Sequence, residues 1–361
     1  MNTDQPAFET DQVPGAPHPR HAERTIGHGA AIQDFMDTAR RERLHHGWLI
    51  TGPRGTGKAT LAWTLTRWLL AGQPDRLQIP PDDPLSRRIA ALAEPRLQLV
   101  RRSVDDKTGR PRSELTVDEV RKLLSFFHLS ATDGGMRVAI IDSADEMNTS
   151  AANALLKLLE EPPENAIIFL ISHQPAQLLP TIRSRCRLLR LGPVSGRDMD
   201  EILHRFGVED GRDRLAALSG GSVGEALRLV GQDGLAIYQQ IVDLFATLPR
   251  LDRQAAARLA DLAGTRPGPE GDPFDLVVTL LDRFLSRAAR AGLLGPPLPE
   301  AAAGEAELFT RIAPDDRVAR DWAAAQAQLS ARARAGRAVN LDPSALVLDM
   351  LIGLAQRKPS S

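Results

Sequence analysis

The chain has 361 residues, enough for two or three domains, and its 45 basic and 46 acidic side chains nearly cancel. This balance excludes the overall basic excess of many nucleic-acid-binding proteins, so a DNA contact would have to be a local patch. A single cysteine, Cys186, excludes internal disulfides and cysteine-based zinc clusters, and no apolar run approaches the roughly 20 residues of a membrane span.

The sequence divides into four stretches of different pattern. Residues 1–23 are polar, rich in proline and without periodicity, which predicts an extended N-terminal arm. Residues 24–192 alternate short apolar runs with helical patterns, which predicts an α/β domain with a parallel sheet covered by helices on both faces. Three short helical patterns follow in residues 193–233, and long helices fill residues 234–361.

A glycine-rich loop stands at the centre of the α/β stretch. It follows an apolar run at Trp48–Ile50 and precedes a helical pattern, which is the context that a phosphate-binding loop requires. Its backbone N–H groups and the helix N-terminus would face phosphates, and Lys58 would reach the β- and γ-phosphates. A purely structural turn is the alternative. The predicted nucleotide-binding positions here are Gly52, Arg54, Gly55, Thr56, Gly57, Lys58, Ala59 and Thr60.

Two positions lack the groups that hydrolysis needs. The residue after the loop lysine is normally Ser or Thr, which holds Mg²⁺, but here it is Ala59, and Thr60 is turned about 100° away on the helix. Asp142 ends an apolar strand pattern and is a predicted nucleotide-site residue, although it could simply cap the next loop. The following position, often a catalytic Glu, is Ser143. We therefore expect a nucleotide site without intrinsic ATPase activity and without a bound metal.

Arg185 lies in a Ser184-Arg185-Cys186 element after the last apolar run. An arginine that reaches the γ-phosphate of an adjoining subunit would stabilise the charge that develops during hydrolysis. From spacing alone, a surface arginine paired with a carboxylate is the simpler interpretation, and Cys186 is expected to be a small buried residue.

Together these residues resemble a known family. The glycine loop, the Ile141-Asp142 strand end, the run from Asn153 to Pro163 and Ser184-Arg185-Cys186 are similar to bacterial clamp-loader subunits of the AAA+ class. The resemblance covers about Arg24 to Gly231. It implies a RecA-like AAA+ domain over residues 24–192, a three-helix lid over 193–233 and an all-helical collar for oligomerisation over 234–361. Ser172 matches the polar first sensor position, although a plain strand-end hydroxyl is an equal alternative.

Within that class the pattern resembles the δ′ type of DNA polymerase III subunit more than the τ/γ motor type. Ala59 and Ser143 depart from the motor pattern, and Gly224 stands where motor subunits carry a sensing arginine. The resemblance implies that the site is idle or merely occupied by ATP or ADP, and that Arg185 completes a neighbour's site. Many relatives carry a zinc-binding cysteine cluster that this chain lacks, so we expect no zinc.

The implied partners are τ/γ and δ subunits, the sliding clamp and primer–template DNA, in the cytoplasm and away from membranes. One alternative is an active AAA+ ATPase that remodels DNA, such as a motor subunit or a branch-migration helicase. Another is a small-molecule P-loop kinase, which would leave the C-terminal helices unexplained. ATP turnover by the purified chain would favour the first alternative.

Overall fold

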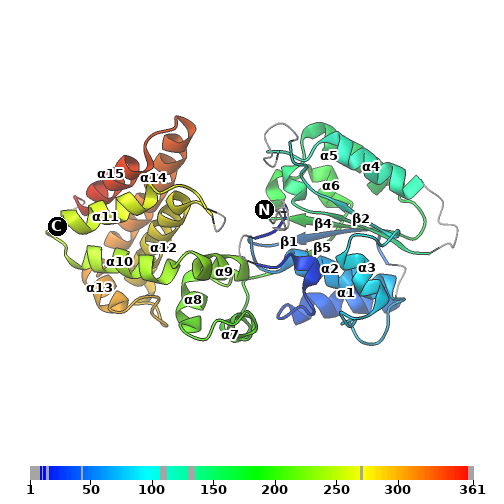
Figure 1. The fold of residues 1–361 in the computed structure, drawn as a ribbon, viewed down its shortest axis with the longest axis horizontal. Coiled ribbons are helices and arrows are strands. Elements are labelled where there is room, and N and C mark those ends of the chain that lie inside the picture. The colour runs from blue at the N-terminus through cyan, green and yellow to red at the C-terminus, as the bar shows by residue number, and fades with distance from the viewer. Residues whose placement is uncertain are drawn as a thin grey trace, which may run out of the picture. The chain divides into compact units, whose positions relative to one another are not determined.

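The computed structural model describes residues 9, 11–13, 16–41, 44–105, 112–128, 135–268 and 271–356. The chain forms two compact units (Figure 1), and each is treated by itself below. Unit 1 consists of Met1–Asp198 with Ser222–Gly224, and unit 2 of Met199–Gly221 with Glu225–Ser361. Within the predicted N-terminal arm, residues 1–8, 10 and 14–15 lie outside the described residues.

Unit 1 is built on a five-stranded sheet in the order β2-β3-β4-β1-β5, and all of its neighbouring strands are parallel. The prediction of a parallel α/β domain is therefore confirmed. The last strand, a short edge strand, was not predicted. The strands are β1 Gly47–Thr51, β2 Leu97–Val100, β3 Arg137–Ile141, β4 Ala166–Ser172 and β5 Arg187–Arg190.

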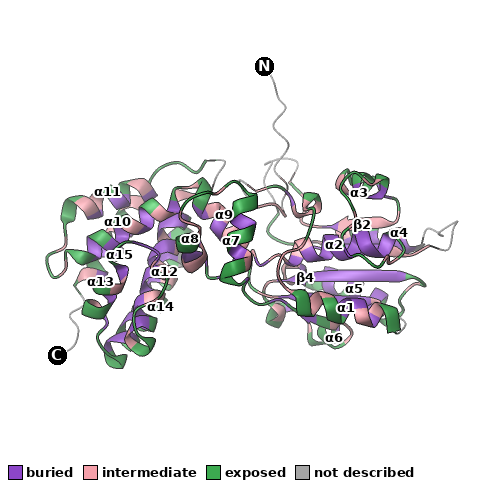
Figure 2. Cartoon of the chain, turned by 90° about the horizontal axis from the view of Figure 1, so that it is seen from below, coloured by how far each residue is buried: buried purple, intermediate pink, exposed green. Residues whose placement is uncertain are grey.

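Helices cover both faces of this sheet (Figure 1). One face packs Trp48, Ile50 and Phe169 against the first three helices, whereas the other face packs Leu49, Ile168 and Leu170 against the next three. Central strand β4 is buried at every position, as its colour in Figure 2 shows. The helices of unit 1 are α1 Gly29–Arg41, α2 Lys58–Leu70, α3 Pro84–Ala90, α4 Val117–His128, α5 Thr149–Glu160 and α6 Pro180–Ser184.

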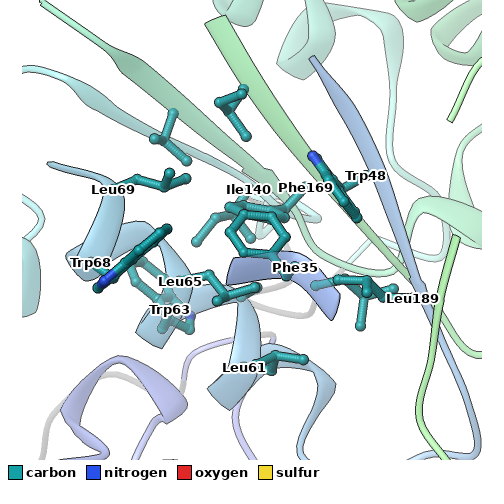
Figure 3. Close-up of a cluster of buried hydrophobic side chains, with 14 of the residues drawn as sticks. Phe35, Trp48, Leu61, Trp63, Leu65, Trp68, Leu69, Ile140, Phe169 and Leu189 are labelled. Atoms are coloured by element: carbon teal, nitrogen blue, oxygen red, sulfur yellow. The ribbon is translucent and has the colours of Figure 1, made fainter. Parts of the chain in front are cut away.

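An aromatic cluster fixes α1 and α2 on the sheet (Figure 3). The ring of Phe35 lies 4.7 Å from that of Trp48, 5.8 Å from that of Phe169 and 6.2 Å from that of Trp68. All four side chains are fully buried. Because Trp48 belongs to β1 and Trp68 to α2, this cluster holds the two elements that flank the glycine loop.

The described part of the N-terminal arm is packed against unit 1. His18 is buried with its ring edge-on to Trp63, and Pro19–His21 form a short 3₁₀ turn. Buried Arg67 of α2 donates to the carbonyls of Arg20 (2.8 Å) and Ala22 (2.7 Å). These contacts tie the arm to the helix that begins at the glycine loop.

The described elements of unit 2 are helical. Asp272 and Asp342 cap two of its helices by accepting hydrogen bonds from the backbone, and Pro occupies the first helical position in both cases. No helix in the described ranges has the length and apolar character needed to cross a membrane. The helices are α7 Gly196–Arg205 (which begins in unit 1), α8 Arg212–Ser219, α9 Val223–Gly231, α10 Gly234–Ala246, α11 Arg253–Ala263, α12 Pro273–Leu294, α13 Glu305–Ile312, α14 Asp316–Ala338 and α15 Pro343–Ala355.

Glu305 is the centre of a polar cluster in unit 2. Its carboxylate accepts a hydrogen bond from the Tyr238 hydroxyl (2.6 Å), two from the Arg287 guanidinium (2.7 Å each) and one from the Ala301 N–H (2.7 Å). Glu305 and Tyr238 are fully buried. The cluster joins α10, α12 and α13 through one carboxylate.

Candidate functional site

The glycine loop runs from the carboxyl end of β1 to the first turn of α2, where the sequence predicted it. Gly52 has a φ of 152°, and a Cβ there would lie 2.2 Å from the carbonyl oxygen of Leu191. Gly57, at φ 90°, is the N-cap of α2. At Gly55 a Cβ would lie 2.2 Å from the Ser222 hydroxyl. Gly52 and Gly55 require glycine because a side chain would clash with its neighbours, and Gly57 favours glycine because of its positive φ.

The carbonyl oxygens of the loop all face protein donors. Within the described residues, the backbone N–H groups of residues 54–58 donate to no protein acceptor. A loop with bonded carbonyls and available N–H groups at a helix N-terminus is suited to an anion such as a phosphate. The bonded pairs are the Pro53 carbonyl with Thr56 Oγ1 (2.9 Å), Arg54 with Ser222 Oγ (2.9 Å), Gly55 with the Gly224 N–H (3.1 Å) and Thr56 with His28 Nε2 (2.7 Å).

Lys58 is buried and turned back onto its own loop. Its ammonium donates to the carbonyls of Gly52 (2.7 Å) and Pro53 (2.6 Å). Burial lowers its pKa to about 8, against the opposing effect of Asp142 and Asp145. The lysine therefore remains largely protonated at neutral pH, and its charge holds the loop closed on itself.

Asp142 is buried at the end of β3, and its N–H donates to the Val100 carbonyl (2.9 Å). Burial raises the pKa of its carboxyl to about 7, and the neighbouring Asp11 adds to the shift. The Ser143 hydroxyl, 3.4 Å from the Asp142 carboxylate, occupies the next position. The Ser143 hydroxyl is not a base near neutral pH, so this position supplies no group that could activate a water molecule.

Two of the predicted loop positions contribute little chemistry in this arrangement. Ala59 packs its methyl group against the core beneath α2. Thr60 lies in the first turn of that helix, and its carbonyl accepts from the Thr64 hydroxyl (2.9 Å). Arg54 has an exposed side chain that forms an ion pair with Glu146 (2.9 Å).

Sequence reasoning missed His173, which follows the predicted Ser172. The Ser172 hydroxyl is fully buried, and neither it nor His173 Nδ1 has a hydrogen-bond partner within the described residues. His173 Nε2 lies 3.4 Å from the Ser143 hydroxyl, and the backbone N–H of His173 donates to the Asp145 carboxylate (2.9 Å). Burial, with the nearby Lys58 and Arg54 charges, lowers the pKa of His173 to about 4. The His173 imidazole is therefore a weak base. The sequence could have predicted it as a site residue, because it directly follows β4 at the carboxyl ends of the strands.

An acidic cluster from the N-terminal arm was also missed. Glu9, Asp11 and His18 place three potential ligand atoms within 4.8 Å of one another. However, Arg101 donates to both carboxylates and Arg20 donates to Glu9, whose pKa falls to about 2 chiefly because of Arg20. Because the carboxylates already face two guanidinium groups, we interpret this as an ion-pair cluster.

Arg185 lies apart from all of these groups. It follows α6 and precedes β5, whose first residue Arg187 pairs with Trp48 near the amino end of β1. The glycine loop follows the carboxyl end of β1. Arg185 therefore lies at the amino ends of the strands and the loop at their carboxyl ends. The five residues of β1 separate these two ends by roughly 16 Å. An arginine side chain cannot cover that distance, so the structure does not bring Arg185 to the chain's own loop.

The backbone around Arg185 is anchored while its side chain stays accessible. Cys186 is partly buried beside the strand residue Gly47, and burial raises the pKa of its thiol to about 12, as expected for an inert packing residue. The Arg185 guanidinium bonds the Glu160 carboxylate (2.9 Å) and the Thr181 carbonyl (3.1 Å), with 38% of the side chain exposed. The predicted pairing with a carboxylate is therefore present, and the guanidinium remains at the surface.

Comparisons with known proteins converge on one family. The family model described as DNA polymerase III, delta subunit, matches residues 27–195. The δ′ subunit of DNA polymerase III from Pseudomonas aeruginosa is 34% identical over 63% of this chain and 69% of its own length. The δ′ subunit from Escherichia coli is 34% identical over 61% of this chain and 68% of its own length.

The gamma/tau relatives match less well than these δ′ subunits. The gamma/tau subunit of DNA polymerase III from Mycobacterium tuberculosis is 29% identical over 67% of this chain and 44% of its own length. Among solved structures, a gamma-subunit-related protein from Thermotoga maritima covers 91% of this chain and 99% of that chain at 17% identity, with a TM-score of 0.42. That structural likeness is too low to bear on function.

Proposed function

Because this chain belongs to the family of DNA polymerase III δ′ subunits and is a clamp-loader subunit, we propose that it supplies Arg185 to the ATP site of a neighbouring subunit and does not hydrolyse ATP itself. One observation carries this proposal. The Arg185 side chain is accessible at the amino ends of the strands, whereas the chain's own phosphate loop lies at their carboxyl ends. Any phosphate that it contacts must belong to another molecule.

The composition of the chain's own site supports the second half of the proposal. Ala59 offers no hydroxyl for a metal ion, and Ser143 and His173 are weak or ineffective bases near neutral pH. The loop nevertheless keeps N–H groups available for a phosphate. The site is therefore suited to binding ATP or ADP and poorly suited to hydrolysing ATP.

The proposed partners follow from the family. We place the chain in a hetero-oligomer with τ/γ motor subunits and a δ subunit in the bacterial cytoplasm, where the complex would load the sliding clamp onto primer–template DNA. The helical stretch from residue 234 onward would form the collar, and the helices of residues 193–233 the lid. Arg185 would then complete the ATP site of an adjoining motor subunit.

The test is Arg185→Ala in the reconstituted complex. An arginine acting in trans contributes about 10³–10⁵ at the site that it completes, so we expect DNA-dependent ATP turnover of the complex to fall about tenfold or more. Complex assembly, measured by size-exclusion chromatography, should not change. Arg190→Ala, an exposed arginine at the other end of β5, is the matched control.

Two outcomes would overturn the proposal. Unchanged turnover with Arg185→Ala would remove the trans role. Rapid ATP hydrolysis by the purified chain alone would favour an active AAA+ ATPase that remodels DNA.

A further inference from the structure

Glu160 is the carboxylate that contacts Arg185. It is the last residue of α5, and its Oε1 lies 2.9 Å from Arg185 Nη2. The other terminal nitrogen of Arg185 donates to the Thr181 carbonyl (3.1 Å). Two contacts from two different helices therefore fix both ends of one guanidinium. Without these contacts, the arginine side chain would lose its rotamer entropy when it adopted a single orientation.

The position of Glu160 is itself fixed by the fold. The neighbouring Leu158 and Leu159 are buried, and the Leu159 carbonyl bonds His46 Nε2 (3.0 Å). The helix ends directly afterwards, before Pro162 and Pro163. These contacts hold the backbone of Glu160, and so the base of its side chain, in place.

Glu160 is a poor choice for helix stability alone. The last turn of a helix carries partial negative charge, so a carboxylate there is unfavourable and a lysine or arginine would be favoured. Glu161 follows immediately, is exposed, and forms no ion pair within the described residues. Of these two acids at the same helix end, Glu160 contacts Arg185, and Glu161 provides a natural comparison.

We propose that Glu160 is a positioning residue that holds the Arg185 guanidinium in the orientation from which it reaches the phosphate of an adjoining subunit. This inference rests on the proposed trans role of Arg185. The pair is half exposed, 38% for Arg185 and 47% for Glu160, and such pairs are weak. A weak ion pair can orient the Arg185 side chain. A triphosphate, which carries several negative charges, can still compete with Glu160 for the guanidinium.

A double-mutant cycle in the reconstituted complex tests this inference. We expect Glu160→Ala to lower kcat for DNA-dependent ATP hydrolysis by about 3–10-fold, because an arginine without its contact must be ordered at each turnover. The KM for ATP should stay within about twofold, since Arg185 acts on the transition state. Glu160→Asp should recover part of the loss, and Glu161→Ala should have less than about a twofold effect.

The decisive measurement is Glu160→Ala in the Arg185→Ala background. If Glu160 acts through Arg185, the double variant is no slower than Arg185→Ala alone. An equal loss in both backgrounds, or no loss from Glu160→Ala in the parent complex, overturns the inference and leaves the trans role of Arg185 standing. An unchanged rate for Arg185→Ala instead overturns the proposed function, so the two failures are distinguishable.

Discussion

Two buried carboxyl groups, one in each unit, are treated in opposite ways. Glu305 in unit 2 accepts four hydrogen bonds, from Tyr238, Arg287 and Ala301. Asp142 in unit 1 faces the Ser143 hydroxyl at 3.4 Å and another acid, Asp11, and its pKa rises to about 7. A buried charge is tolerated only where partners offset its desolvation, so the first carboxylate supports the fold and the second weakens it.

The same contrast extends to their surroundings. Near Asp142 the Ser172 hydroxyl and His173 Nδ1 are buried without hydrogen-bond partners among the described residues. Unpaired buried groups of this kind each cost about 1–3 kcal/mol and are typical of a binding site rather than of a structural core. The difference teaches that the polar groups around Asp142 cost unit 1 stability, whereas the Glu305 cluster in unit 2 stabilises packing.

The largest expected effect is on the stability of unit 2. Glu305→Ala leaves the Arg287 guanidinium buried without its carboxylate, and removing one partner of a buried pair costs about 3–5 kcal/mol. Hydrogen exchange measured on peptides of α10, α12 and α13 should show this loss of protection. Glu307→Ala, an exposed acid on the same helix, should change it by less than about 0.5 kcal/mol. A small effect of Glu305→Ala would break the comparison.

An intermediate effect of opposite sign is expected at Asp142. Its pKa of about 7 in the folded chain lies above the ordinary value of 3.8, so the native state binds the extra proton and stability falls as pH rises from about 4 to 7. Asp142→Asn removes that penalty and should raise the free energy of unfolding of unit 1 by about 2–4 kcal/mol at pH 8. The gain should disappear near pH 4.

Urea titrations at both pH values, followed by hydrogen exchange of β3 peptides, measure this change. Asp118→Asn, an exposed acid paired with Arg121, is the control and should be nearly neutral at pH 8. If Asp142→Asn is destabilising at pH 8, the attraction between Asp142 and Lys58 outweighs the cost of burying the carboxylate, and the comparison fails.

The smallest effect is expected from Lys58→Ala. Its ammonium bonds carbonyls of its own loop in this structure, and we propose that this site does not hydrolyse ATP. Clamp loading by the reconstituted complex should therefore change less than about twofold, compared with the loss of tenfold or more for Arg185→Ala. A fluorescence assay of clamp loading on primed DNA measures both. A loss with Lys58→Ala as large as that with Arg185→Ala would show that nucleotide at this site drives loading.

Local sequence pattern determined most of unit 1 and the identity of its loop. Continuous apolar runs predicted β1, β3 and β4, since a central parallel strand is buried on both faces. Glycines in the loop and the substitutions at Ala59 and Ser143 were equally readable, because loop chemistry depends on consecutive residues. The short edge strand β5 was missed because only Leu189 among its four residues is buried.

Only the tertiary structure decided the arrangements that span the sheet. The parallel pairing of β5 with β1 puts Arg185 at the amino ends of the strands, whereas the loop lies at their carboxyl ends. The packing of α5 against α6 brings Glu160 to Arg185 from 25 positions earlier. His173 reaches Ser143, and the N-terminal arm reaches Arg101, in the same way. Sequence periodicity fixes which face of an element is buried, but contacts between distant residues depend on how the elements are ordered in space, which no local pattern encodes.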